Sequence, residues 1–186
     1  MNNKSIAQKL IELAQEIDPD LKAVKDTLAQ MNEEYWTINI PKGLTIEQAY
    51  KDCQALFPCW RWTDDNLDQL YNSDRTSKKA YSIKVKANIE ADENLKNMSA
   101  NDLKEKGIKG ITLLERLVLE KDYFQKIGKH LDIDNVTLCS GSRGSDGDVP
   151  EVDWHDADGL VVHWYNPDNA NDNLRSREVV SNKSPD

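Results

Sequence analysis

The chain has 186 residues, of which 38% are hydrophobic and 31% are charged, and its formal net charge is −9 at pH 7. This composition is typical of a folded protein with one sizeable core. The acidic balance argues against nucleic acid as a partner, because phosphate binding needs clustered Lys and Arg. No stretch approaches the roughly 18 apolar residues that cross a bilayer, so no membrane span is predicted.

The first residues lack the continuous apolar core of a secretory signal, so we expect a cytoplasmic or particle-associated protein with reduced cysteines. Residues 1–31 are predicted to form a helical lead-in, because apolar residues recur on one helical face until Pro19. This lead-in either packs on the core or serves oligomerisation or tethering, and the oligomeric state stays open. Residues 32–186 are expected to form a single domain.

The first half of this domain mixes strands and helices. A strand is predicted over 35–40, followed by a helix that begins at a capping box of Thr45 and Gln48. The polar stretch after Trp62 is interpreted as irregular. Apolar residues alternate from Tyr81, which predicts a half-buried strand whose lysines face water, and a short helix is expected after Ser99.

The second half begins with a helix between a capping box, Thr112 with Glu115, and a terminating Gly128. A strand over 136–139 follows. Residues 152–154 and 160–164 are predicted to pair as a hairpin around 156–159, and 174–180 to form the last strand. The class is therefore α+β, with helices segregated from a small antiparallel sheet.

The segment 140–173 carries the clearest functional signal. Asn, Asp, Ser and Gly make up more than half of it, yet Trp154, Trp164, Tyr165 and the run 160–162 are embedded among them. Such residues bury apolar area, which a disordered tail does not do. Short polar residues with Tyr and Trp also dominate antibody paratopes. We therefore expect a folded binding surface, with Trp154 and Trp164 buried by strand alternation and with Trp60 and Trp62 available for stacking.

Catalytic and metal sites are weighed against this interpretation. The acidic cluster suggests calcium, but the nearest EF-hand register puts Trp154 at the first ligand position and Tyr165 at the last. His and Cys lack the spacing of a zinc site. Cys139 at a strand end is expected in the core rather than as a nucleophile beside a histidine. The stretch 166–168 is interpreted as a turn. No cofactor and no metal are predicted.

Several motifs together resemble a known family. They are Leu138-Cys139-Ser140-Gly141-Ser142-Arg143, Asp146-Gly147, Val149-Pro150, Trp164-Tyr165-Asn166-Pro167-Asp168 and Leu174-Arg175-Ser176-Arg177, preceded by Gly128-Lys129-His130-Leu131-Asp132. Over roughly 112–181 the chain resembles the variable proteins of diversity-generating retroelements, which occur in phages, archaeal viruses and microbes. The resemblance implies a C-type lectin-like fold with a variable region at about 140–176. It also implies a protein or cell-surface ligand, and no enzymatic activity.

The same resemblance implies which positions vary. In this family adenine-specific mutagenesis scatters Asn codons into other residue types. The implied variable, ligand-binding positions are Gly144, Ser145, Asp148, Glu151, Asp153, His155, Asp156, Ala157, Asp158, His163, Tyr165, Asn169, Asn171 and Asn173. Glu151 departs from the pattern, because an Asn codon altered only at its adenines does not give Glu. The implied scaffold is Arg143, Val149, Pro150, Val152, Trp154, Trp164, Pro167, Leu174 and Arg177.

Strand alternation supports this division. It puts Asp153, His155, His163 and Tyr165 on one face, where substitutions cost little stability. The opposite face carries Val152, Trp154, Val162 and Trp164. Three alternatives stay open. The segment is an ordinary polar loop surface with Arg175 and Arg177 as strand-edge charges, or the protein is a calcium-dependent carbohydrate-binding lectin, or it is an enzyme of the formylglycine-generating type. The last type needs a cysteine pair in this region, where only Cys139 lies.

Overall fold

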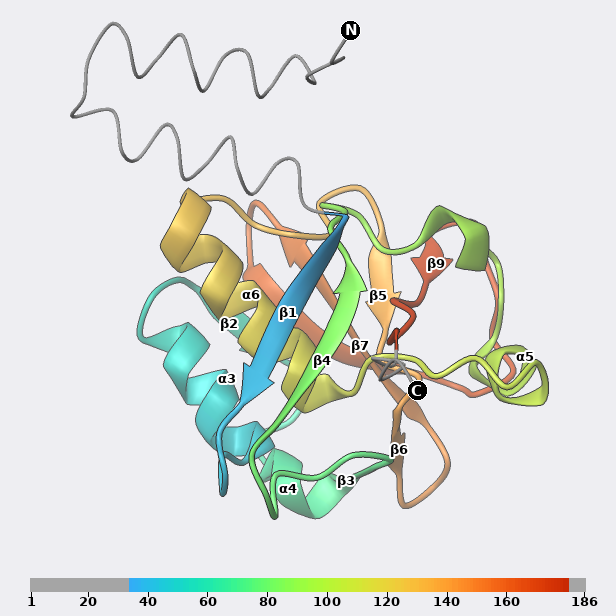
Figure 1. Ribbon diagram of the computed structural model, residues 1–186, viewed down its shortest axis with the longest axis horizontal. Helices are drawn as coiled ribbons and strands as arrows, with labels where there is room; N and C mark the ends of the chain where they lie inside the picture. Colours follow the sequence, from blue (N-terminus) through green and yellow to red (C-terminus); the bar gives the residue numbers. More distant parts are fainter. Residues whose placement is uncertain (1–33, 181–186) are drawn as a thin grey trace, which may run out of the picture.

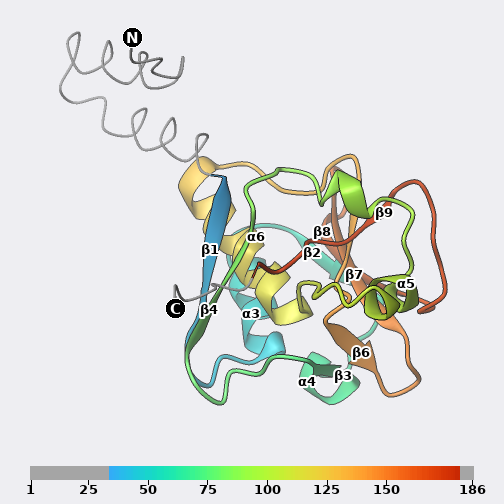
Figure 2. The same ribbon diagram turned by 45° about the vertical axis from the view of Figure 1, so that its right-hand side comes forward.

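The computed structural model describes residues 34–180, which form a mixed α+β fold with three small sheets (Figures 1 and 2). The predicted lead-in, 1–31, lies outside the described residues. The elements, in chain order, are β1 (Tyr35–Ile40), α3 (Ile46–Gln54), β2 (Cys59–Arg61), α4 (Leu67–Leu70), β3 (Tyr71–Ser73), β4 (Tyr81–Lys86), η1 (Glu93–Leu95), α5 (Ala100–Glu105), α6 (Leu113–Ile127), β5 (Val136–Leu138), β6 (Ser142–Gly144), β7 (Val149–His155), β8 (Gly159–Tyr165) and β9 (Leu174–Arg175).

The main sheet has five strands in the order β2-β8-β7-β5-β9. The predicted hairpin is confirmed: β7 and β8 pair antiparallel, and the turn closes at Gly159 with a φ of 79°. The pairs β2–β8 and β5–β9 are parallel, however, so the expectation of an antiparallel sheet is wrong for these two pairs. Two further antiparallel pairs, β1–β4 and β3–β6, stand outside this sheet.

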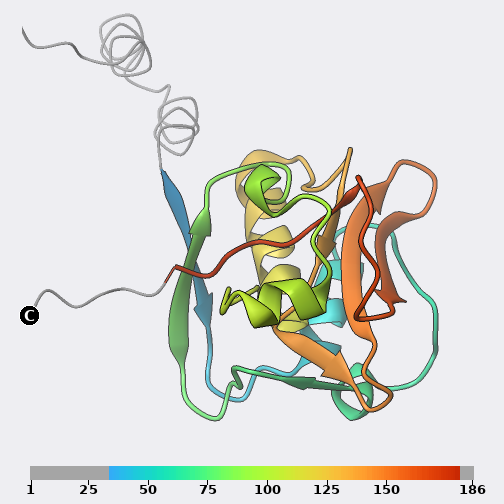
Figure 3. The same cartoon turned by 90° about the vertical axis from the view of Figure 1, so that its right-hand side faces the viewer.

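Helix α6 lies between the β1–β4 pair and the main sheet (Figure 3). Its first half is buried, because Leu113, Leu114 and Leu117 pack in the main apolar core. Its predicted ends are confirmed: Thr112 and Glu115 form a reciprocal capping box, and Gly128 takes the left-handed conformation at the C-terminus. A smaller apolar cluster, which includes Leu95, Leu103, Leu138, Val149 and Leu174, joins α5 to the sheet.

Two capping predictions have different outcomes. The short helix expected after Ser99 forms as α5, and Ser99 caps it in a capping box with Asp102. Thr45 accepts a hydrogen bond from the backbone N–H of Gln48 and so caps α3. The side chain of Gln48 donates to Asp52 instead of returning to the cap, so only half of that predicted capping box forms.

The stretch after Trp62 is not irregular throughout, so that interpretation was wrong. It contains α4 and β3, and the three-residue β2 precedes it. Each of these elements is too short to show a periodicity in the sequence. Strands β2 and β3 exist because they pair with β8 and β6, which lie about 70 to 100 residues further along the chain.

The predicted last strand, 174–180, is also shorter than expected. Only Leu174–Arg175 forms a strand, and isolated bridges follow at Glu178 with Gly110 and at Val180 with Lys84. The second bridge joins Val180 to the backbone of Lys84 on β4. The stretch departs from strand pairing because Arg175, Ser176 and Arg177 are all buried and bonded to other segments.

A buried ion-pair network surrounds Asp132, between α6 and the main sheet. Arg116 of α6 and Arg177 both contact its carboxylate, at 2.8 Å and 2.7 Å. Arg116 also binds Glu120 at 2.7 Å, and all four side chains are fully buried. Two cations and two anions thus balance, as burial of charge requires. Arg177 is therefore not a strand-edge charge, and neither is Arg175, which is also buried and pairs with Glu93.

Replacing Arg177 with Met should lower the free energy of unfolding by about 3–5 kcal/mol, because it leaves the carboxylate of Asp132 buried with one cation fewer. Urea denaturation of both proteins measures the change. Lys129→Met, at an exposed position after α6, is the matched control and should stay within about 0.5 kcal/mol of the parent. Equal losses in the two variants would show that the network does not hold the fold.

Candidate functional site

The candidate site is the outward face of the β7–β8 hairpin, on the side of the molecule away from β1 and β4 (Figure 3). Alternation along the strands divides the hairpin as predicted: Val152 and Val162 lie in the core, and Trp154 packs against it. Glu151 pairs with His163, and Asp153 with Val161, on the outward side. The regular strands therefore fix the direction of each outward side chain.

A groove of about 420 Å³ runs over this face. Residues of β7 and β8 form most of it, and β2 and β5 contribute one residue each. The lining residues are Trp60, Val136, Glu151, Asp153, His155, Asp158, Val161, His163 and Tyr165. The only basic groups in this lining are the two histidines, so the groove is acidic.

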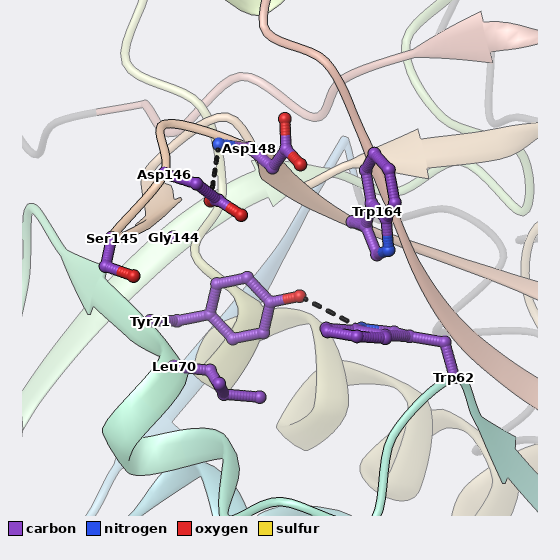
Figure 4. Close-up of a pocket in the computed structure, with 8 residues that line it drawn as sticks. All are labelled: Trp62, Leu70, Tyr71, Gly144, Ser145, Asp146, Asp148 and Trp164. Carbon is purple, nitrogen blue, oxygen red and sulfur yellow. Dashed lines mark hydrogen bonds between the residues drawn. The ribbon is translucent and has the colours of Figure 1, made fainter.

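A second hollow, of about 250 Å³, lies beside Trp164. The antiparallel pair β3–β6 brings Tyr71 opposite Gly144, which places the loop 144–148 above the Tyr71 ring. Two indole rings complete the hollow, and Figure 4 shows them around it with the carboxylates of the loop. The lining residues are Trp62, Leu70, Tyr71, Gly144, Ser145, Asp146, Asp148 and Trp164.

An aromatic ridge, formed by Trp60, His163, Trp164 and Trp62, connects the two hollows. The ring of His163 lies nearly parallel to Trp60 and to Trp164, with ring centroids 6.0 Å and 5.7 Å away. Trp62 meets Trp164 edge-on at 6.2 Å, and its Nε1 donates to the hydroxyl of Tyr71. The side chains of the three tryptophans are partly exposed: Trp60 is 46% exposed, Trp164 37% and Trp62 39%. The ridge therefore presents rigid apolar area to solvent.

Most of the implied variable positions gather in these two hollows. The groove is lined by Glu151, Asp153, His155, Asp158, His163 and Tyr165. The second hollow is lined by Gly144, Ser145 and Asp148. Asp156 and Ala157 lie exposed at the hairpin turn. Asn169, Asn171 and Asn173 lie in the loop between β8 and β9 and line neither hollow.

Two of these positions are buried, so the low cost expected for substitutions on this face does not extend to them. Glu151 and Asp153 face outward but are each only 9% exposed, because they form the floor of the groove. Asp153 accepts a hydrogen bond from His155 at 2.7 Å. The Oε2 atom of Glu151 has no hydrogen-bond partner among the described residues, and Nδ1 of His163 is 3.8 Å from its Oε1.

The burial of Glu151 changes its protonation. Removal from water, together with the nearby charge of Asp153, raises the pKa of Glu151 to about 8. Burial also raises the pKa of Asp153, an effect that the neighbouring His155 opposes. The folded protein therefore holds a proton on Glu151 under conditions in which an unfolded chain has lost it.

Trp164 was expected to be buried and is not. β2 pairs with β8 only as far as Val162, so the end of β8 has no neighbouring strand on that edge. Sequence reasoning also missed Tyr71 as a wall of the second hollow, since it fell in the stretch interpreted as irregular. The one available signal was the spacing of two aromatic residues, Trp60 on β2 and Trp62 directly after it.

The remaining expectations concern chemistry. Cys139 is fully buried in the core, as expected, and burial raises the pKa of its thiol, which disfavours a nucleophilic thiolate. The stretch 166–168 is a turn as predicted, in which the Asn166 side chain accepts from the Asp168 N–H. Within residues 34–180, no three His, Cys, Asp or Glu side chains are grouped so that they would hold a metal ion.

Replacing Glu151 with Gln should reduce the pH dependence of stability. Because the folded pKa is raised, the contribution of Glu151 is full below about pH 4.5 and is lost as the pH rises through about 8. The unfolding free energy of the parent should fall over this range, and the variant should fall less. Urea denaturation at several pH values measures both slopes. Asp158→Asn, an exposed carboxylate in the same groove, is the control, and a Gln variant with the parent's slope would contradict the assignment.

Among the described residues no helix is both long and apolar enough to cross a membrane. Comparison of the chain with protein families, with curated proteins and with solved structures finds no match. A function for this chain therefore has to be argued from the geometry of the β7–β8 face.

Proposed function

We propose that this chain is a variable ligand-binding protein with a C-type lectin-like fold, of the kind diversified by retroelements, and that the β7–β8 face contacts its ligand. The observation that carries the proposal is the clustering of most implied variable positions around two hollows at the β7–β8 hairpin, which the aromatic ridge connects. A contiguous surface is what a binding site needs, and scattered positions would not supply one.

Binding suits the side chains of this face better than catalysis does. The exposed tryptophans supply large, rigid contact area at little cost in side-chain entropy, as aromatic residues do in paratopes. Short Ser, Asn and Asp side chains around them supply adaptable hydrogen bonds. The ligand is a protein or a cell-surface component, because two open hollows and a ridge form a broad surface rather than one enclosed pocket.

Exposure decides which positions can vary without loss of the fold. Ser145, His155–Asp158, Asn169 and Asn173 are exposed, and substitutions at such sites stay within about 0.5 kcal/mol. Glu151 and Asp153 form a floor beneath them and are more constrained. The proposed variable surface thus consists of an exposed rim around a partly buried acidic floor.

Sequencing of this gene and its flanking DNA across a population of its source tests the proposal. Differences should concentrate at the codons of the exposed rim, and a nearby near-copy of the segment should carry adenines at those codons. Val152 and Val162, which alternate with the rim in the same hairpin but point into the core, are the internal control and should stay constant.

Substitutions spread evenly along the gene, without a nearby copy, would contradict diversification. Variation confined to another face of the molecule would contradict the placement of the ligand-binding surface.

A further inference from the structure

The second hollow has aromatic walls whose chemistry does not depend on diversification, while Asp148 on its rim is one of the implied variable positions. Its walls are the rings of Trp62, Tyr71 and Trp164, and Figure 4 shows all three bordering one space. The two indole planes stand at 75° to each other with centroids 6.2 Å apart, so they form two sides of a corner. None of these three residues is among the implied variable positions.

The orientation of these walls is fixed by the protein. Nε1 of Trp62 donates to the Tyr71 hydroxyl at 3.3 Å, which holds the two rings together. Tyr71 is 7% exposed and belongs to the main core, so it supports Trp62 from beneath. The hollow is therefore formed before any ligand arrives, which lowers the entropic cost of binding.

The rim of the hollow is anionic. Asp146 and Asp148 line it, and the loop that carries them is fixed by the bond from the Asp148 N–H to Oδ1 of Asp146. The backbone N–H of Gly144 also donates to the Asp148 carbonyl at 2.7 Å. No Lys or Arg lines the hollow, so nothing there neutralises the two carboxylates.

Aromatic faces beside carboxylates attract cations. A primary ammonium keeps three strong donors, and the ring faces would leave some of them without a partner. A trimethylammonium group has no N–H and presents methyl groups to the rings, so it loses little by leaving water. The hollow of about 250 Å³ is several times the share of one water molecule, about 30 Å³, and has room for such a group.

We propose that this hollow binds a trimethylammonium cation that carries no adjacent phosphate. The positive nitrogen lies against Trp62 and Trp164, and Asp146 and Asp148 attract it from the rim. A phosphate next to the cation would face these two carboxylates and would be repelled. The groove across the ridge is a poorer match, because it offers the single indole of Trp60 over a floor of buried carboxylates.

Titration of the full chain with choline, followed by isothermal calorimetry and tryptophan fluorescence, tests the proposal. Choline should bind saturably. Its neutral isostere 3,3-dimethylbutan-1-ol should bind at least about threefold more weakly, because it lacks the charge that the rings attract. Phosphocholine should also bind more weakly than choline. Equal binding of the neutral isostere, tighter binding of phosphocholine, or no binding of choline would each overturn the proposal.

Matched variants locate the site. Trp62→Leu should weaken choline binding about five- to thirtyfold, whereas Trp60→Leu, at an exposed tryptophan that does not line the hollow, should leave it unchanged. Circular dichroism checks that both variants fold. Asp148→Lys, a change in the half-buried loop residue of the rim, should also weaken binding and covers the case in which the Trp62 variant unfolds. A loss in Trp60→Leu alone would assign the cation to the groove and overturn the proposal.

Discussion

The buried carboxylate of Asp132 is the point on which the rest of the structure depends. It accepts from Arg116 on α6, from Arg177 after β9 and from Thr137 on β5, while its own carbonyl accepts from the N–H of Trp154 on β7. Asp132, whose backbone φ is 53°, thus joins helix α6 to β5, to β7 and to the segment after β9. Because charges at this depth are stable only when paired, the segments are held in one relative arrangement.

This network lies directly behind the candidate ligand-binding face. His130 binds Glu120 of the network and stacks on Trp154, which belongs to the same strand as Asp153 and His155. The hairpin is therefore supported from within by ion pairs and aromatic packing, and its exposed side chains contribute little to that support. Such a separation would let the exposed side chains of the proposed variable surface change without changing the fold.

The sequence predicted the elements whose signals are local. The capping box at Thr112, the left-handed Gly128 and the alternation on both sides of Gly159 each lie within a few residues, and all three were confirmed. The features that were missed depend on distant partners: β2 and β3 exist through β8 and β6, and Trp164 is exposed because β2 ends early. Glu151 is buried for the same kind of reason, since it lies on a strand flanked on both sides, opposite Leu138 of β5 and His163 of β8.

A deep mutational scan of residues 130–177 in the full chain, read as protease resistance on a display system, tests the central claim most directly. The account predicts that Ser145, Asp156, Ala157 and Asn169 accept nearly all substitutions. It predicts that Asp132, Val152 and Arg177 accept almost none. The account would be contradicted if substitutions at the hairpin turn were tolerated as poorly as those at Val152, or if substitutions at Asp132 were tolerated. Either result would rule out a rigid scaffold that carries a replaceable surface.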